Sequence, residues 1–467
     1  MYIDSHAHLT MEHFDADREA VIERALGAGI EAIIVVGTDV ASSLAAIELA
    51  ARHPRLHPTA GIHPHDAEGV DEESWARLEE LARRPEVVAV GETGLDYFKA
   101  YAPIEAQRRV FRRQLRLARQ VRKPVVIHCR DAGDDLLAIL REEHAEERGG
   151  VMHCFSGSQA LAETCLELGF FISFAGQLTF ANAESLRGVA KALPVDRLMV
   201  ETDCPYLAPA PRRGKRNEPS FVLHTAARLA ELHGLTVADL ARITSFNARR
   251  LFRLDGGGPE RQGAIAYRIR RSLYLNITNR CTSDCSFCAR ELDPSVKGHF
   301  LGLREEPTTE ALCGAVAEHL AAGSEGIEEI VFCGYGEPTL RLTVLLDVAR
   351  YCKAHGLPVR LNTNGHGNLI HKRDIVPELV GLIDAVSVSL NAETPQGYVA
   401  VCRPRFGPRA YDAVLEFIRR CRDALPRVIA TAVRGIPGAP VDIEACRRLA
   451  EVELGVEFRV REYDRVG

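Results

Sequence analysis

Three cysteines, Cys281, Cys285 and Cys288, stand in the stretch "NITNRCTSDCSFCARE", directly after a segment with strand pattern. Cysteine thiolates at this spacing bind zinc or iron. A structural zinc site takes four ligands, and His299, eleven residues after Cys288, is the nearest downstream candidate for the fourth. A [4Fe–4S] cluster is normally held by four cysteines, so three would leave one iron free for another ligand. The spacing alone is compatible with both metals.

Histidines and acids form a second set of candidate ligands in the first half of the chain. Each stands at the carboxyl end of a predicted strand, the face where barrel enzymes build their active sites. These residues are His6, His8, Glu92, His128, His153 and Asp203. Four imidazoles and two carboxylates can hold two divalent ions, with one carboxylate between them. Two ions roughly 3.5 to 4 Å apart can clamp the attacking and leaving oxygens of a phosphodiester.

Eight strand patterns separated by helical patterns must position these six side chains. The predicted strands cover residues 2–5, 32–37, 56–61, 87–92, 125–128, 150–154, 170–175 and 198–203. Segments with an apolar period of 3.6 lie between most of them, such as residues 102–121. Eight strands alternating with helices over about 250 residues predict a (β/α)8 barrel of the TIM type.

The second half repeats the alternation with fewer strands. We expect six, at residues 273–278, 329–334, 359–364, 385–390, 428–433 and 457–462. Six strands predict a partial (β/α)6 barrel or, alternatively, an open doubly wound sheet. Gly256, Gly257 and Gly258 in succession mark the boundary between the two patterns. The expected organisation is therefore a domain at 1–254, a glycine-rich linker at 255–263 and a domain at 264–467.

The bulk composition fits a two-domain cytoplasmic protein. A chain of 467 residues exceeds one ordinary hydrophobic core. It has no apolar run long enough to span a bilayer and no basic-then-apolar N-terminus typical of a signal peptide, so no membrane association is expected. Its 13 cysteines, an odd number, indicate reduced thiols rather than a disulfide framework. A net charge of −6 gives no global attraction to nucleic acid, so phosphate would have to bind at a local site.

The motifs around the histidines resemble the TatD family of metal-dependent hydrolases. They are "DSHAHL", "GIHPHDA", "GETGLDY", "VIHCRDA", "HCFSGS" and "ETDCPYLAP", in this order over residues 1–254. The resemblance implies an amidohydrolase-superfamily barrel that acts on DNA phosphodiesters, with Glu92 and Asp203 as catalytic residues. By matched motif, one ion would be held by His6, His8, Glu92 and Asp203, and the second by Glu92, His128 and His153. His63 and His65 would touch the substrate at the mouth. The ions could be Mg, Mn or Zn.

Five basic residues near these motifs are candidate phosphate contacts. Arg130 follows His128 by two positions, and the loop "APRRGKRNEP" carries Arg212, Arg213, Lys215 and Arg216. A basic loop beside the site could hold the phosphates of a nucleic acid strand. A solvated surface loop is the alternative interpretation of these four residues.

The second half resembles the radical S-adenosylmethionine enzymes. The cysteine spacing, with Phe287 just before Cys288, is typical of that superfamily, and "FCGYGEPTL" is similar to its glycine-rich turn. The resemblance covers residues 264–467 and implies a [4Fe–4S] cluster whose open iron binds S-adenosylmethionine. An electron from an unidentified donor would then release a 5′-deoxyadenosyl radical that acts on an unknown target. Cofactor contacts would come from Gly334, Gly336, Glu337, Asn364, Ser389 and Asn391.

The sequence therefore predicts a bifunctional enzyme, a di-metal deoxyribonuclease joined to a radical-generating domain. An amide or ester hydrolase is an alternative for the first half, because one fold hosts several chemistries. A zinc-stabilised binding module is the alternative for the second half.

Overall fold

The computed structural model describes residues 2–254, 263–288, 295–321, 326–439 and 441–463. The chain forms two compact units, Met1–Gly258 and Pro259–Gly467. Residues 255–262 of the predicted linker lie outside the described residues. No helix among those described is both long and apolar enough to cross a membrane.

The first unit is built around an eight-stranded parallel sheet in the order β1 to β8. Its strands are β1 (Tyr2–Ala7), β2 (Ile30–Val35), β3 (Leu56–Ala60), β4 (Ala89–Asp96), β5 (Val125–Arg130), β6 (Gly150–Met152), β7 (Phe171–Phe174) and β8 (Leu198–Val200). An isolated parallel bridge between Ala7 and Cys204 joins the ends of the sheet into a nearly closed barrel. The predicted (β/α)8 barrel is confirmed.

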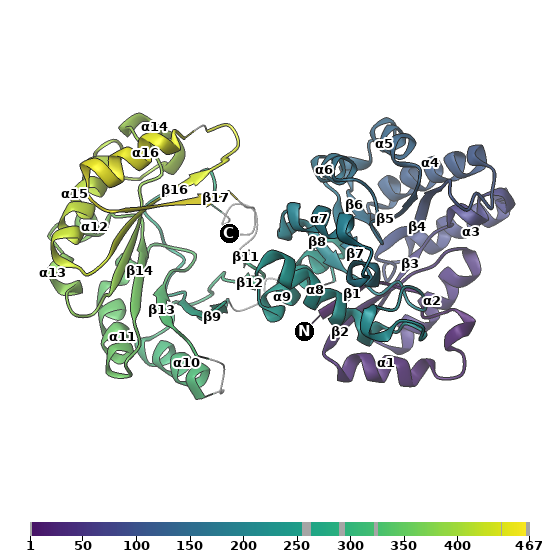
Figure 1. The fold of residues 1–467 in the computed structure, drawn as a ribbon, viewed down its shortest axis with the longest axis horizontal. Helices are drawn as coiled ribbons and strands as arrows, with labels where there is room; N and C mark the ends of the chain where they lie inside the picture. The colour runs from purple at the N-terminus through teal and green to yellow at the C-terminus, as the bar shows by residue number, and fades with distance from the viewer. Residues whose placement is uncertain (1, 255–262, 289–294, 322–325, 440, 464–467) are drawn as a thin grey trace. The chain divides into compact units, whose positions relative to one another are not determined.

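Nine α-helices belong to the described part of this unit and cover the outside of the barrel (Figure 1). They are α1 (Arg18–Gly27), α2 (Val40–Arg52), α3 (Glu72–Arg83), α4 (Ile104–Val121), α5 (Gly133–Glu142), α6 (Gln159–Glu167), α7 (Glu184–Ala192), α8 (Val222–His233) and α9 (Val237–Phe252). Side-chain caps begin several of them: the Asp39 carboxylate accepts from the Ser42 amide at the start of α2, and Thr236 caps α9.

The barrel interior is filled by apolar side chains, and one end of the barrel is polar. Ile3, Val126 and Met199 point inward and pack against Leu251 and Phe252 at the end of α9. This cluster fills the interior, whereas the larger core lies between the strands and the outer helices. The carboxyl ends of the strands are therefore left for polar side chains, as in other barrels of this type.

The second unit contains a seven-stranded sheet in the order β17-β16-β15-β14-β13-β10-β9. Its strands are β9 (Ala266–Ile269), β10 (Ser272–Leu275), β13 (Glu329–Phe332), β14 (Val359–Thr363), β15 (Ala385–Ser389), β16 (Val428–Arg434) and β17 (Glu457–Glu462). The six strands from β10 to β17 are parallel and follow chain order, as in a partial barrel, whereas a doubly wound sheet reverses its strand order. The predicted (β/α)6 barrel is thus confirmed, with an additional antiparallel edge strand, β9.

The remaining elements of the second unit cover or flank this sheet. A separate two-stranded ribbon pairs β11 (Ser295–Val296) with β12 (His299–Phe300). The helices are α10 (Thr309–Ala321), α11 (Leu342–Ala354), α12 (Gly367–His371), α13 (Val376–Leu379), α14 (Pro395–Cys402), α15 (Arg409–Ala424) and α16 (Ile443–Arg448). The apolar core lies between these helices and the outer side of the sheet.

Candidate metal centre and candidate cluster site

Glu92 is the centre of the polar end of the first barrel. Its carboxylate is almost fully buried, and each of its oxygens faces different histidines. Oε1 lies 2.8 Å from Nε2 of His153, 3.1 Å from Nδ1 of His128 and 3.3 Å from Nε2 of His63. Oε2 lies 3.3 Å from Nε2 of His6 and 3.6 Å from Nε2 of His8. One carboxylate therefore stands between two groups of imidazoles.

Asp203 completes the group on the side of Oε2. Its Oδ1 lies 3.3 Å from Nε2 of His8 and 3.8 Å from Nε2 of His6. The ligand atoms of His6, His8 and Asp203 all lie within 4.8 Å of one another, as do those of His63, Glu92 and His128. The structure thus brings together all six residues predicted as metal ligands, and His63 joins them.

Close approach of the neighbouring strands makes this convergence possible. Gly94 on β4 has a positive φ, and a Cβ there would lie 1.9 Å from the carbonyl oxygen of His128 on β5. Only glycine can occupy this position, because both the conformation and the space exclude a side chain. β4 and β5 consequently pair up to Asp96 and Arg130, and they present Glu92 and His128 side by side.

The charges of the site are arranged as a cation-binding site requires. Burial alone would raise the pKa of Glu92, but the imidazoles of His153, His63 and His6 hold it well below its usual range. Burial opposes the charged form of His153, yet Glu92 and Glu201 raise its pKa well above the ordinary value. The buried carboxylates therefore favour positive charge at the neighbouring imidazoles. A divalent cation can supply that charge, because metal binding and protonation compete for the same nitrogens.

Three further acids hold the ligands in place, and sequence reasoning missed all of them. Oε1 of Glu201 accepts a 2.6 Å hydrogen bond from the Cys154 amide and lies 3.2 Å from Nδ1 of His153. Oδ2 of Asp96 lies 3.2 Å from Nε2 of His128 and 2.9 Å from Nε2 of His65. Asp4 accepts hydrogen bonds from the amide of His6 and from the amide and hydroxyl of Thr202, the residue before Asp203. Such partners fix the orientation of ligating groups.

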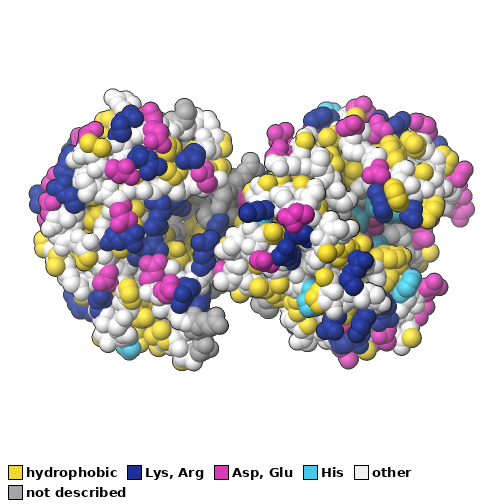
Figure 2. Space-filling view, viewed as in Figure 1, with side chains coloured by type: hydrophobic (Ala, Val, Ile, Leu, Met, Phe, Trp, Pro, Cys, Tyr) yellow, Lys and Arg dark blue, Asp and Glu magenta, His cyan; other side chains and the backbone are white. Residues whose placement is uncertain are grey.

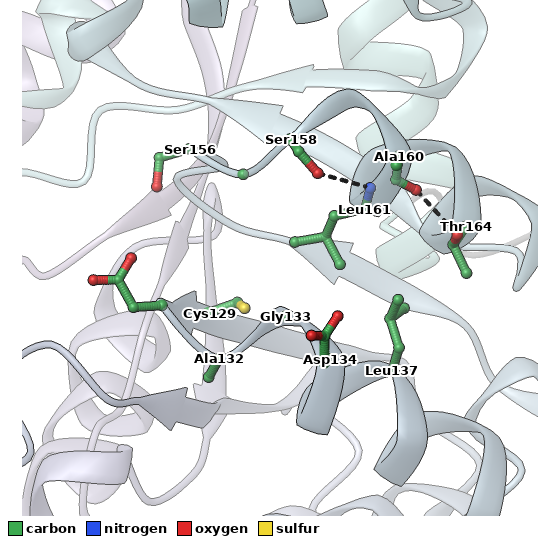
Figure 3. A pocket seen from close by; sticks show the side chains of 12 residues that line it. Cys129, Ala132, Gly133, Asp134, Leu137, Ser156, Ser158, Ala160, Leu161 and Thr164 are labelled. Carbon is green, nitrogen blue, oxygen red and sulfur yellow. Dashed lines mark hydrogen bonds between the residues drawn. The ribbon is translucent and has the colours of Figure 1, made fainter.

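A cavity of about 820 Å³ opens over these residues. His63, His65 and Arg130 line it, as the sequence predicted for substrate contacts, together with Lys99, Tyr101 and Tyr206. Histidine side chains are visible inside a hollow of this unit in the space-filling view (Figure 2). A smaller cavity of about 370 Å³ shares Cys129 and Ser156 with it and lies at the starts of α5 and α6 (Figure 3).

The basic loop predicted to hold phosphates does not line the large cavity. Arg216 instead forms an ion pair with Asp17 and donates to the carbonyl of His13. The guanidinium groups of Arg212 and Arg213 lie over aromatic rings, those of Phe221 and Phe180, and Lys215 is exposed. Their role in phosphate binding stays a prediction.

In the second unit the three cysteines occupy a half-buried loop after β10. The amide of Cys288 donates to the carbonyl of Cys285, which turns the chain back on itself. The loop is attached to α14, because the Ser286 amide donates to the carbonyl of Val401. Nδ2 of Asn364, at the end of β14, lies 3.8 Å from Sγ of Cys281. His299 is engaged elsewhere: its Nε2 lies 3.1 Å from the carbonyl of Arg268, and its ring lies against Tyr267.

The predicted glycine-rich turn packs directly against the segment that leads into the cysteine loop. A Cβ on Gly334 would lie 2.2 Å from Oδ1 of Asn276, and one on Gly336 would lie 2.2 Å from the carbonyl of Arg280. Both glycines are therefore required by contacts within the protein. They allow the turn to pack closely against the segment that precedes Cys281.

The other predicted cofactor contacts lie near the strand ends. The Glu337 carboxylate is buried and accepts hydrogen bonds from Thr339, Thr363 and the Asn364 amide. Asn391 has a positive φ, and its Nδ2 lies 3.5 Å from Sγ of Cys402. Ser389 is half-buried at the end of β15. Glu337 thus joins the turn after β13 to the end of β14, beside the cysteine loop.

Comparisons with known proteins assign a family to each half. Residues 3–253 match the family model described as TatD related DNase, and residues 275–450 match that of the Radical SAM superfamily. An uncharacterized metal-dependent hydrolase, YabD of Bacillus subtilis, is 47% identical over 255 residues, which is 55% of this chain and 100% of YabD. The 3'-5' ssDNA/RNA exonuclease TatD of Erwinia tasmaniensis is 38% identical over 257 residues, 54% of this chain and 99% of that protein.

A solved structure shows the same relationship for the first unit. The crystal structure of YJJV, a TatD homolog from Escherichia coli K12, covers 54% of this chain and 98% of its own, with 34% identity and a TM-score of 0.52. The resemblances to both families are confirmed, and both halves are enzyme domains.

Proposed function

Because this chain belongs to the family of TatD related DNases and carries a radical SAM domain, we propose that it is a bifunctional enzyme. In this proposal, residues 1–254 form a di-metal deoxyribonuclease and residues 264–467 a radical-generating domain, with 255–263 as the linker. None of the cysteines that the structure describes is in a disulfide, which supports the reducing cytoplasm as its location.

The observation that carries the nuclease proposal is the position of Glu92 between two sets of imidazoles. Its Oε2 faces His6 and His8, which with Asp203 would hold one divalent ion. Its Oε1 faces His128 and His153, which would hold the other. Two bound ions supply charge stabilisation and an activated water for attack on a phosphodiester. Asp203, which lines the cavity, would accept the proton that the attacking water loses.

Hydrolysis of DNA by the metal-free protein after addition of Mg, Mn or Zn tests this proposal. We expect cleavage only with a divalent ion present. Parallel assays with amide and ester substrates address the alternative hydrolase. If those bonds are cleaved and DNA is not, the family relationship stands, but the DNA substrate is wrong.

For the second unit, the observation that carries the proposal is the packing of the glycine-rich turn and Asn364 against the cysteine loop. Cys281, Cys285 and Cys288 would hold a [4Fe–4S] cluster, and the strand ends with Glu337, Ser389 and Asn391 would receive S-adenosylmethionine. When bound and reduced, this pair supplies a 5′-deoxyadenosyl radical. The residues of the chain fix the loop that holds the three thiolates: Ser286 anchors it to α14, and Asn364 donates to the hydroxyl of Thr282.

Anaerobic incubation of the iron-reconstituted protein with S-adenosylmethionine and dithionite tests this assignment. We expect brown protein and formation of 5′-deoxyadenosine, with the physiological electron donor replaced by dithionite. A colourless protein that contains zinc and forms no 5′-deoxyadenosine would instead support the zinc-stabilised binding module.

A further inference from the structure

The inner face of the second barrel carries polar and charged residues, whereas the interior of the first is filled by apolar side chains. Successive residues of a strand point to opposite faces of the sheet. The core between the sheet and the helices contains the alternate residues Leu273, Leu361, Val388 and Ala430, so their neighbours face inward. The inward-facing residues include Tyr274, Arg360, Asn362, Ser387, Ser389 and Thr431. Barrels without a ligand in their interior are normally filled with branched apolar side chains, so this interior is suited to a polar molecule.

Two arginines of β17, Arg459 and Arg461, extend this inner face. Phe458 packs against the outer core, so Arg459 and Arg461 point to the opposite side of the sheet. In the strand register, Arg459 stands beside Thr431 of β16, which stands beside Ser389 of β15. Because neighbouring strands lie about 4.8 Å apart, the Cα atoms of Arg459 and Ser389 are separated by about 10 Å. The arginines therefore stand level with a proposed cofactor contact.

Glu329 and Glu457, the acids nearest to these arginines, are already held by other guanidinium groups. Arg360 lies 2.8 Å from Oε1 of Glu329 through Nη2 and 3.1 Å from Oε2 through Nε. Arg427 lies 2.9 Å from Oε1 of Glu457 through Nε and 2.7 Å from Oε2 through Nη2. Within the described part of the chain, the two arginines of β17 form no ion pair with a carboxylate, and both are exposed. Two positive charges on the inner face are thus available to a ligand.

The chemistry of the inner face favours an oxyanion. Guanidinium groups bind carboxylates and phosphates through paired, charge-assisted hydrogen bonds. Asn362 and Ser387 add neutral hydrogen-bonding groups, and the half-buried ring of Tyr274 adds an aromatic surface. In the space-filling view, Lys and Arg side chains gather around a hollow of the second unit (Figure 2).

We propose that the inner face of the second barrel binds a small anionic molecule, whose phosphate or carboxylate group is held by Arg459 and Arg461. A molecule about 10 Å long reaches from these arginines to the strand end with Ser389, where the radical would be formed. The substrate class of the radical chemistry is therefore a phosphate or carboxylate ester, acid or salt of low molecular mass. This inference rests on the proposed radical-generating function of the second unit and adds the residues that select its target.

Titration calorimetry with three matched probes tests the inference. Full-length, cluster-loaded protein is first saturated with S-adenosylmethionine under anaerobic conditions, so that the site for the cofactor's own carboxylate is filled. Phenyl phosphate, benzoate and benzyl alcohol are then titrated, because they share a phenyl ring and differ in charge. We expect phenyl phosphate or benzoate to bind at least about tenfold tighter than benzyl alcohol, and the tighter anion identifies the recognised group.

Three double variants locate the binding. Arg459→Gln/Arg461→Gln should remove the preference for the anion. Arg419→Gln/Arg420→Gln, which removes two charges from the exposed surface of α15, should keep it. Arg459→Lys/Arg461→Lys retains the charge but not the planar fork, so it should weaken anion binding less than the glutamine pair does. An anion that binds in the first unit stays bound in all three variants, so the binding that is lost belongs to the second unit. Equal iron content shows that the variants are folded.

Equal affinity for the three probes would overturn the inference, and so would unchanged anion binding in Arg459→Gln/Arg461→Gln. Loss of S-adenosylmethionine binding in this variant, with no preference for an anion in wild type, would assign the arginines to the cofactor and would overturn it as well. If neither ligand depends on them, the two arginines serve only as charges that protect the open edge of the sheet at β17.

A separate assay distinguishes failure of this inference from failure of the proposed function. Formation of 5′-deoxyadenosine with dithionite, measured without any probe, reports on the radical chemistry alone. If 5′-deoxyadenosine is formed and no anion is preferred, the radical function stands and the substrate class is wrong. If an anion binds through Arg459 and Arg461 and no 5′-deoxyadenosine is formed, the anion site stands and the radical-generating function is wrong.

Discussion

The two candidate sites of this protein differ in how completely the fold assembles them. In the first unit, a nitrogen of each of five histidines already lies within 3.6 Å of a Glu92 oxygen, and these residues stand on the barrel strands or shortly after them. In the second, the cysteines lie on a half-buried loop. Among the described residues, the sets of three ligand atoms that lie within 4.8 Å of one another all belong to the first unit. The candidate ligands of the first site are thus positioned by strands, whereas those of the second stand on a loop.

The two sites also differ in how they treat a buried carboxylate. Imidazoles surround Glu92 and keep its pKa well below the usual range, although burial acts in the opposite direction. Glu337 is equally buried, and burial raises its pKa even though backbone and hydroxyl donors oppose this. At the first site, imidazoles that can carry positive charge surround the carboxylate. At the second site, neutral donors form hydrogen bonds to the Glu337 carboxylate, which joins the turn after β13 to the end of β14.

Loss of one cysteine is the largest effect that this comparison predicts. Cys285→Ala should abolish both the visible absorption of the reconstituted protein and the formation of 5′-deoxyadenosine, because a three-cysteine cluster has no spare ligand. Cys313→Ala, which removes a half-buried cysteine of α10, should change neither. Full cluster content in Cys285→Ala would contradict the ligand assignment. Iron analysis and anaerobic product assays measure the outcome, and DNA cleavage by the same variant should be normal.

Glu92→Gln tests the preassembled site in the same way. Replacement keeps the shape of the side chain but removes the charge that two groups of imidazoles share. We expect metal-dependent DNA cleavage to fall more than about a hundredfold. Glu105→Gln, an exposed acid at the start of α4, is the control and should cleave normally. Activity within a few-fold of wild type for Glu92→Gln would show that the carboxylate does not join two ions.

A buried histidine makes the stability of the second unit depend on pH. His366, in the second unit, is fully buried between the hydroxyls of Thr282 and Tyr398, and burial lowers its pKa to about 4. The unfolded chain therefore binds more protons than the folded one between about pH 6.5 and 4. The stability that this neutral histidine provides is complete above pH 6.5 and is lost as the pH falls through that window, by up to about 3 kcal/mol.

Calorimetric unfolding of the full chain between pH 4 and 7 measures this effect. The single tryptophan, Trp75, lies in the first unit, so a transition without a change in its fluorescence belongs to the second. His366→Asn should flatten the pH dependence of that transition. His355→Asn, which replaces an exposed histidine of the same unit, should keep it. An unchanged slope in His366→Asn would exclude His366 as the titrating group.

A smaller effect is expected from a residue that orients one of the candidate ligands of the first site. Glu201 contacts Nδ1 of His153 and the Cys154 amide, and it has no access to solvent. Glu201→Gln should weaken metal binding or activity by about ten- to a hundredfold, because the orienting acceptor for His153 is altered. Metal titration by calorimetry measures the change, with Glu163→Gln on the surface of α6 as the control. If affinity and activity both stay at wild-type values, Glu201 has only a packing role.

Much of the fold and of the first candidate site could be predicted from the sequence. The remaining features depend on contacts between residues far apart in the chain. Apolar runs alternating with helical patterns predicted the barrel strands, and the His, Glu and Asp residues at or after the ends of these runs placed the six candidate ligands at one end of the first sheet. The short strands β9, β11 and β12 carry too little pattern to be recognised. Glu201 stands two residues before Asp203 in "ETD", yet its contact with His153 depends on which strands the fold makes neighbours. The same holds for Arg216, whose partner Asp17 is 199 residues away.

The smallest expected effect comes from separating the two units. The apolar cores are separate: one cluster joins residues such as Val35 and Leu229 of the first unit, and another joins Leu275 and Val388 of the second. Chains with independent cores joined by a glycine-rich segment normally fold as separate domains. A fragment of residues 1–254 should therefore keep the metal-dependent DNA cleavage of the full protein, within about twofold.

A fragment of residues 263–467 is the more demanding test of the same idea. It should bind one cluster and form 5′-deoxyadenosine at the rate of the full chain, because Cys281, Cys285, Cys288 and Glu337 all lie within it. Its sheet has two open edges, β9 and β17, which makes it the fragment more prone to aggregate. Solubility and iron content are measured first, and activity is compared only for soluble, loaded protein. If soluble fragments are folded but inactive, and mixing them does not restore what the intact chain does, the two sites depend on each other through the covalent link and are not independent enzymes.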